Sequence, residues 1–440
     1  MLVYTIAYIV SFILSRIPLN GVSGIVLIFA AIYIYRKRYK ESSNVVDLLG
    51  IYGLGFIAAQ GIACFKLSYL QNEWSPLTWL CLYLAYACPY ISYHILNKKL
   101  KYDKTVKSIS KLKGGIGKKQ LNIIYMAMIL LSIVSLCAFL TEAAVLAYIP
   151  LFVRGVPHAY SYFHIRGVHY FTVSCVLVPS VGVIYTLYSD KLSKVRLMGM
   201  SVCIFISLII PILCVSRFQL IFALICAILT IVVIKKNIPV KLLMYTFVLL
   251  AIMYVILTIA RSHDVKYLNS IFEMRYDLPI FISQPYIYIS NNYDNFNYLV
   301  THISTYSLGL KSLYPFIALT GLKFFVPALA DFPIYVVKEE LSTLTLIYDA
   351  YYDFGIAGVV IFGILLGLLI YILERLIYTR SNPIIYLIYA QSTLYLMLSF
   401  FTAWFSNPTT WFYFAISVLI YIAVFFISTG DRNDNFKQVK

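Results

Sequence analysis

Two arginines stand at the ends of apolar runs. Arg217 separates two such runs in Cys-Val-Ser-Arg-Phe-Gln-Leu, and Arg261 ends a later run and opens Arg-Ser-His-Asp. A charge beside a bilayer is costly and therefore marks a candidate functional site. Because a planar guanidinium binds phosphate oxygens in pairs, we predict that Arg217 and Arg261 emerge at one membrane level and bind a pyrophosphate. The alternative for Arg217 is an ordinary turn arginine that reaches lipid headgroups.

A second group of polar residues lies in the segment 142–169. Arg154, His158, Tyr162 and Arg166 recur every four residues, which on a helix would place them in one stripe. Pro157 argues against a continuous helix that begins at Arg154. Two cations with a histidine and a tyrosine suit an anionic headgroup, although ordinary snorkelling to a membrane interface explains the stripe equally well.

The segment 261–353 supplies the candidate proton acceptors. Asp353 precedes Phe-Gly at the start of an apolar run, and His302 lies in the middle of the segment. Either side chain could take a proton from a hydroxyl group. Asp353 could instead be a helix N-cap, a role that aspartate favours. Arg275 and His263 add binding candidates to the same segment.

Several kinds of site are excluded or unsupported by the motifs. No Gly-x-x-x-x-Gly-Lys sequence is present, which excludes a phosphate-binding ATPase loop. No histidine or cysteine spacing supports a metal site, and no cofactor is implied. The eight cysteines lie in or beside apolar runs without a Cys-x-x-Cys pair, so we interpret them as small apolar residues of helices.

The composition identifies the elements that must position these groups. Of 440 residues, 61% are hydrophobic and only 12% are charged, and the mean hydropathy is +0.84. So few charges cannot cover a water-soluble surface, and so much apolar character excludes intrinsic disorder. A transmembrane helix needs about 20 mostly apolar residues. Twelve runs near that length are found at 2–15, 19–35, 47–70, 75–96, 120–141, 170–188, 197–215, 218–234, 240–260, 354–373, 384–403 and 410–428.

Basic residues set the expected orientation, because lysine and arginine accumulate in cytoplasmic loops. Placing both termini in the cytoplasm puts Arg36–Lys40 and the basic segment 98–119 inside, and all four tryptophans near the outer interface. The net charge of +17 is then an orientation signal and not a sign of nucleic-acid binding. We predict an all-α polytopic membrane protein with helices 1–9 in 1–260, an external loop at 142–169 and a long external loop at 261–353. Helices 10–12 follow in 354–428, with a cytoplasmic tail at 429–440.

The segment 299–335 is the critical point of this topology. Its apolar pieces are interrupted by Lys311, Pro315, Lys323 and Pro327. We expect short interfacial or re-entrant helices here, since irregular backbone at membrane depth is tolerated when it is buried in protein. A full span would invert every later segment.

The layout resembles the Wzy-type polysaccharide polymerases, or oligosaccharide repeat unit polymerases. Three stretches carry the resemblance: the Ser216-Arg217 turn before Phe218, Arg261 followed by Gln284–Phe296, and Leu344-Thr-Leu-Ile-Tyr-Asp-Ala-Tyr-Tyr-Asp-Phe-Gly-Ile-Ala-Gly. The last runs directly into 359–373, with Gly363 and Gly367 on one helix face. The topology matches over nearly the whole chain, whereas the motifs cover about a tenth of it.

The resemblance implies a glycosyltransferase-C-like fold and a site in the bacterial cytoplasmic membrane. A glycan on undecaprenyl pyrophosphate would be transferred to the sugar of an incoming lipid-linked repeat unit at the outer face. The base would be Asp353 or His302. Membrane lipids, a chain-length regulator and a flippase of the same pathway are the implied partners. The binding residues for pyrophosphate and glycan would be Arg217, Arg261, Arg275, Arg166, His263, Arg154 and His158.

Two other functions stay open at this point. An O-antigen ligase uses a similar donor but transfers the glycan to a lipid A-core acceptor. A flippase or transporter for lipid-linked oligosaccharides would place charges at the midplane of several helices, often in two related halves. Here most spans are nearly free of charge and the polar groups gather in the outer loops, which favours chemistry at the surface.

Overall fold

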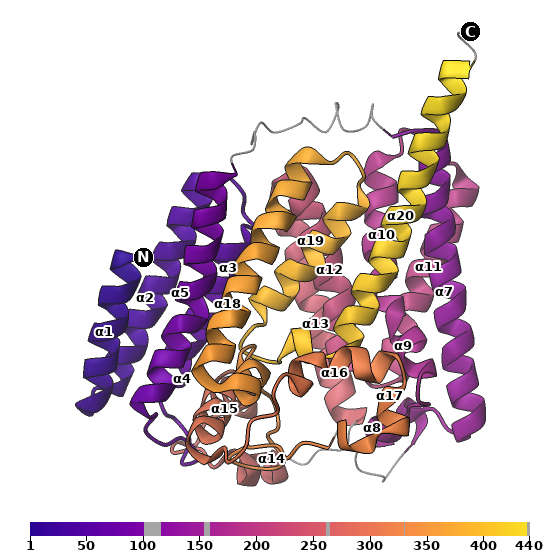
Figure 1. Ribbon diagram of the computed structural model, residues 1–440. Helices are drawn as coiled ribbons and strands as arrows, with labels where there is room; N and C mark the ends of the chain where they lie inside the picture. The colour runs from indigo at the N-terminus through magenta and orange to yellow at the C-terminus, as the bar shows by residue number, and fades with distance from the viewer. Residues whose placement is uncertain (101–115, 154–158, 261–264, 330, 438–440) are drawn as a thin grey trace. The chain divides into compact units, whose positions relative to one another are not determined.

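The computed structural model describes residues 1–100, 116–153, 159–260, 265–329 and 331–437 (Figure 1). Within these ranges the chain is helical and contains no strand, apart from an isolated antiparallel bridge between Ser68 and Met274. For 159, 254–260, 265–266 and 427–437 only the backbone is described. Four predicted site residues lie outside the described ranges: Arg154, His158, Arg261 and His263.

The contacts divide the chain into two discontinuous units. Unit 1 comprises residues 1–102, 264–375 and 395–411, and unit 2 comprises 103–263, 376–394 and 412–440. These units cut across the segments expected from the sequence, because most of the predicted external loop 261–353 packs with the N-terminal helices in unit 1.

Unit 1 begins with helices that turn back on one another. A π-helical turn at Leu54–Ala58 joins α3 to α4, and α15 packs against α4. Its helices are α1 (Leu2–Arg16), α2 (Asn20–Ser42), α3 (Leu48–Gly53), α4 (Ala59–Ala63), α5 (Pro76–Lys99), α14 (Val265–Phe272), α15 (Ile280–His302), α16 (Leu310–Leu319), α17 (Leu322–Phe325) and most of α18 (Tyr348–Thr379), with 3-10 turns at Pro327–Leu329 and Trp404–Ser406.

Glycines allow two close helix crossings in unit 1. A Cβ at Gly61 of α4 would lie 2.6 Å from the carbonyl oxygen of Gly24 in α2, so neither position has room for a side chain. On α18, a Cβ at Gly367 would lie 2.5 Å from the carbonyl oxygen of Pro89 in α5, and one at Gly363 would lie 2.7 Å from Cys88. Gly363 and Gly367 therefore form the contact face of α18 against α5, as small residues do where helix backbones approach closely.

A buried ion pair joins α2 to the start of α3. Arg38 is 4% exposed and donates through Nε and Nη2 to the two carboxylate oxygens of Asp47, at 3.0 and 2.8 Å. The guanidinium also lies 3.8 Å from Glu374 of α18 and 4.8 Å from the ring centre of Tyr93, whose hydroxyl donates to Glu374. The sequence placed Arg38 in an inner loop, whereas in the structure it lies in α2, where three helices and two carboxylates enclose its side chain.

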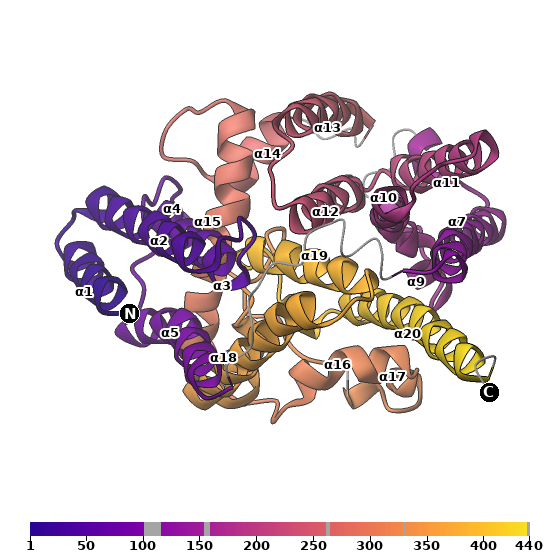
Figure 2. The same ribbon diagram turned by 90° about the horizontal axis from the view of Figure 1, so that it is seen from above.

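Unit 2 groups its long helices around α10. Figure 2 shows α7, α10, α11 and α12 side by side, as their contacts also require. The elements of unit 2 are α7 (Lys118–Leu146), α8 (Ala159–Tyr162), α9 (Val168–Val173), α10 (Val178–Tyr188), α11 (Lys194–Leu213), α12 (Arg217–Lys235), α13 (Val240–Ala260), most of α19 (Ile384–Met397) and most of α20 (Pro408–Lys437), with 3-10 turns at Pro150–Phe152 and Ser174–Leu177.

Six helices of the described chain are long and apolar enough to cross a membrane: Lys118–Leu146, Val168–Tyr188, Lys194–Leu213, Arg217–Lys235, Tyr348–Thr379 and Pro408–Phe426. The protein is therefore a helical membrane protein by the length and composition of its helices. The other six expected spans are also helical, but over the described residues they are shorter or less apolar. Among the described residues of 299–335 the structure has the end of α15 and the short helices α16 and α17, and none of these is one of the six candidate spans.

The predicted long loop contains one helix that the sequence did not suggest. Helix α15 has 23 residues, and thirteen of them are buried in unit 1. Their polar side chains are held by the chain around them: Asn295 Nδ2 donates to the carbonyl oxygens of Leu341 and Thr343, and Tyr293 donates to that of Phe56. The asparagines and tyrosines of this stretch therefore serve as hydrogen-bonding partners inside a packed helix.

Candidate functional site

A buried carboxylate orients a histidine in unit 2. Glu142, near the end of α7, is fully buried and accepts hydrogen bonds from the backbone N–H of Ile165 at 2.9 Å and from Thr172 Oγ1 at 2.7 Å. Its two oxygens lie 3.1 and 3.2 Å from Nδ1 of His169 in α9. These donors replace the water that Glu142 loses on burial, which is the condition for keeping a carboxylate charged inside a protein.

This arrangement suits proton transfer by His169. Because Nδ1 faces a carboxylate, it carries the ring hydrogen, and Nε2 is left as the proton acceptor. The carboxylate also stabilises the imidazolium that forms when Nε2 takes a proton, as the acid of a catalytic triad does. The His169 side chain is 33% exposed, so a substrate can reach it, whereas Glu142 cannot be reached.

Two of the predicted binding arginines belong to the same unit. Arg166 lies between Ile165 and His169 in the sequence, and it is exposed. Arg217 begins α12 directly after a tight turn in which Val215 has a left-handed backbone with φ of 54°. Cys214, at the start of that turn, is close enough to Glu142 for an electrostatic interaction. The turn before Arg217 therefore lies within electrostatic range of Glu142.

A second histidine extends this group. The ring of His164 lies 6.3 Å from that of His169, nearly perpendicular to it, and is exposed. Its Nδ1 is 3.2 Å from the carbonyl oxygen of Ser161, so it has a backbone partner where His169 has a carboxylate. Of the two rings, only His169 has a carboxylate partner that would stabilise its imidazolium.

Asp353, predicted as a base or as a helix N-cap, caps a different helix from its own. The chain breaks its helical path at Phe354 and at Gly355, whose φ of 59° favours glycine. The Asp353 carboxylate accepts hydrogen bonds from Ser307 Oγ at 2.5 Å and from the backbone N–H groups of Lys311 and Ser312 at 3.0 and 2.9 Å. These N–H groups open α16, and Asp353 is 1% exposed. Three donors thus occupy this buried carboxylate, which fits the capping role.

The other predicted residues of unit 1 lie apart from this carboxylate. His302 is exposed and stacks on Tyr298 with ring centres 4.0 Å apart, and its Nδ1 lies near the Tyr298 carbonyl and the Thr301 hydroxyl. Arg275 donates to the carbonyl oxygen of Ser68 at 3.2 Å and covers the ring of Tyr69. Among the described contacts, none joins Asp353, His302 and Arg275 to one another.

The described residues contain no group of three or more histidine, cysteine or acidic side chains that could hold a metal ion. No protein-family model, curated protein or solved structure matches this chain. The candidate site is therefore defined by its own geometry: Glu142, His169, Arg166 and the turn at Arg217.

Proposed function

We propose that this chain is a glycosyltransferase of the bacterial cytoplasmic membrane that polymerises lipid-linked oligosaccharide repeat units. The growing glycan would be transferred from undecaprenyl pyrophosphate to the sugar of an incoming lipid-linked unit. The Glu142–His169 pair carries this proposal, because it supplies an oriented proton acceptor in the same unit as Arg166 and Arg217. The resemblance to Wzy-type polymerases supports the same reaction.

In the proposed reaction the acceptor hydroxyl gives its proton to Nε2 of His169. The hydroxyl oxygen then forms a bond to the anomeric carbon of the donor glycan. The bond between that carbon and the pyrophosphate oxygen breaks, and the pyrophosphate leaves with the electron pair. Arg166 and Arg217 neutralise the charge that develops on it, and Glu142 stabilises the imidazolium.

The test is complementation of a strain that lacks the gene. A polymerase mutant makes lipid core capped with a single repeat unit, whereas a flippase or ligase mutant lacks even this capped species. We expect His169→Ala to abolish the polysaccharide ladder on a gel, since loss of a general base slows a reaction by about 10²–10⁴-fold. Glu142→Gln should shorten the ladder strongly at unchanged protein level, because the amide cannot stabilise the imidazolium.

His302→Ala is the matched control, because it removes an exposed imidazole whose described hydrogen bonds are only to Tyr298 and Thr301. A normal ladder is expected from this variant. A normal ladder from His169→Ala with a lost ladder from His302→Ala would move the base to unit 1 and contradict the proposal.

The proposal also requires the site to face outward. A reporter fused after Gly167, directly before α9, should be active only outside the cytoplasm. A cytoplasmic signal at this position would place His169 on the inner face and refute the outer-face reaction.

A further inference from the structure

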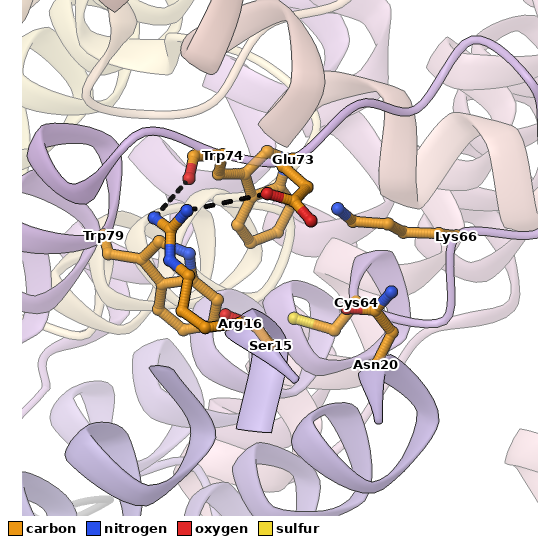
Figure 3. A pocket seen from close by; sticks show the side chains of 8 residues that line it. All are labelled: Ser15, Arg16, Asn20, Cys64, Lys66, Glu73, Trp74 and Trp79. Atoms are coloured by element: carbon orange, nitrogen blue, oxygen red, sulfur yellow. Dashed lines mark hydrogen bonds and ion pairs between the residues drawn. The ribbon is translucent and has the colours of Figure 1, made fainter. Parts of the chain in front are cut away.

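Unit 1 contains a polar pocket that the proposed reaction does not use. It is a narrow pocket, open to solvent, that lies between the end of α1, the start of α2, the end of α4 and the loop that leads to α5 (Figure 3). Its walls carry two cations, one acid, one amide and two indole rings, contributed by Arg16, Lys66, Glu73, Asn20, Trp74 and Trp79.

The first cation is held in place without being neutralised. Arg16 Nη2 donates to the carbonyl oxygen of Trp74 at 2.8 Å, and the guanidinium lies 5.1 Å from the ring centre of Phe12. Its acidic partner, Glu73, is 3.7 Å away and 71% exposed. An exposed ion pair at this distance contributes little and is readily exchanged for another anion.

The second cation, Lys66, has no described acidic group as close to it as Glu73 is to Arg16. Figure 3 shows the Lys66 ammonium pointing into the pocket on the side of Glu73. Within the described ranges, no hydrogen bond or ion pair within 4 Å holds this ammonium. Burial lowers the pKa of Lys66, and the nearby Asp294 and Glu73 carboxylates only partly oppose this effect. A half-buried ammonium without a close partner is stabilised when an anion enters beside it.

The wall behind the cations is rigid. The Trp74 indole donates to Asp294 Oδ1 at 2.8 Å, stacks on Tyr293 with ring centres 5.9 Å apart, and contacts Trp79 at 5.5 Å. Gln71 Nε2 donates to the other oxygen of Asp294 at 2.9 Å. Both oxygens of Asp294 accept hydrogen bonds, so this carboxylate is fixed in the wall behind the pocket. A pre-formed wall also lowers the ordering cost of binding a ligand.

We infer that this pocket binds a phosphate group between Arg16 and Lys66. The guanidinium would take two phosphate oxygens and the ammonium a third, and the anion would displace Glu73 from its loose pair. Asn20, whose buried Oδ1 has no hydrogen-bond partner, can accept from a hydroxyl group beside the phosphate. The phosphate can come from the headgroup of an anionic lipid or from a soluble sugar phosphate. This inference does not depend on the proposed reaction.

The experiment uses the full chain purified in a neutral maltoside detergent. Two of its four tryptophans line the pocket, so tryptophan emission reports on binding there. One arm titrates inorganic phosphate against potassium chloride at matched ionic strength. The other arm counts retained dioleoyl phosphatidylglycerol by native mass spectrometry, with phosphatidylcholine as the neutral comparison.

Charge variants distinguish a specific phosphate site from nonspecific electrostatic attraction of anions. Lys66→Gln should weaken binding about tenfold or more, and Glu73→Gln should strengthen it about threefold. Lys323→Gln is the matched control, because it removes one positive charge from α17, where the ammonium lies over the Tyr314 and Phe324 rings. Its effect should stay within about twofold.

The two arms identify the source of the phosphate. If Lys66→Gln specifically weakens the binding of phosphatidylglycerol, the natural ligand is a lipid headgroup. If it specifically weakens the binding of inorganic phosphate, the natural ligand is soluble. Equal effects of Lys66→Gln and Lys323→Gln in both arms would overturn the inference. If Lys66→Gln does not fold, Lys66→Arg must retain binding and Glu73→Gln must strengthen it, and failure of either overturns the inference.

Discussion

Asp294 makes the stability of unit 1 depend on pH. Burial raises the pKa of this carboxyl from 3.8 to about 7, against the opposing effects of the donors Gln71 and Trp74 and of the charge on Lys66. Asp294 lies in α15, outside the six spans. In the unfolded chain Asp294 ionises near pH 4, so between about pH 4 and 7 folding takes up a proton. Its contribution to stability is complete below this window and is lost as the pH rises through 7.

The magnitude follows from the size of the shift. One pKa unit corresponds to about 1.4 kcal/mol, so the folded state loses about 3 kcal/mol relative to the unfolded state between pH 5 and pH 8. In the Asp294→Asn variant the side chain cannot ionise. Its amide accepts one of the two hydrogen bonds that Asp294 accepts and opposes the other donor, at a cost of about 1–3 kcal/mol at pH 5.

The assay is thermal unfolding in detergent, followed by tryptophan emission from pH 5 to pH 8. The wild-type curve should fall with pH relative to the Asp294→Asn curve, and the two should meet near pH 8. Subtracting the variant removes the contribution of every other titrating group. A difference that is flat, or that rises with pH, would show that Asp294 is ionised throughout and would refute the reasoning.

Three other changes test the packing. Arg38→Gln leaves the buried Asp47 carboxylate without its cation and should lower the unfolding free energy by about 3–5 kcal/mol. Thermal unfolding measures this change, and an unchanged midpoint would contradict the buried pair. Gly61→Ala should strongly lower the yield of monodisperse protein. Gly182→Ala should not, because a Cβ at Gly182 would lie 3.5 Å from the nearest atom. Equal yields of the two variants would contradict the close crossing of α2 and α4. Asp353→Ala removes the cap of α16 and should cost about 1–3 kcal/mol, with faster hydrogen exchange in 310–319, and unchanged exchange there would argue against capping.

The helices were predictable where their pattern is local. Runs of apolar residues fix the existence of a helix, and the spacing of Gly363 and Gly367 places both on one face. The partner of that face was not predictable, because Cys88 and Pro89 lie in α5, far away in the sequence. The helix α15 was missed because much of its buried surface is made of asparagine and tyrosine, whose hydrogen-bonding partners, such as the Leu341 and Phe56 carbonyl oxygens, come close only after folding.

The candidate site was predictable only in part. Arg217 gave a signal as an isolated charge between apolar runs. Glu142 gave the same kind of signal, as a single acid at the end of the run 120–141, but its partner could not be identified from the sequence. His169 reaches Glu142 because the chain turns back so that the Ile165 N–H also binds the carboxylate. Asp353 is the opposite case. The sequence suggested it as a base, but in the structure its carboxylate accepts hydrogen bonds from the first N–H groups of α16.

The discontinuity of unit 1 has a consequence for the order of synthesis. Helix α5 leaves the ribosome long before α18, because roughly 250 residues lie between Lys99 and Tyr348, among them the segment 103–263 of unit 2. At about 5–20 residues per second this interval lasts about 10–50 seconds. During it, the α5 face at Cys88 and Pro89 has no glycine face to contact. The N-terminal helices of unit 1 therefore have to avoid aggregation in an incomplete state until α18 is made.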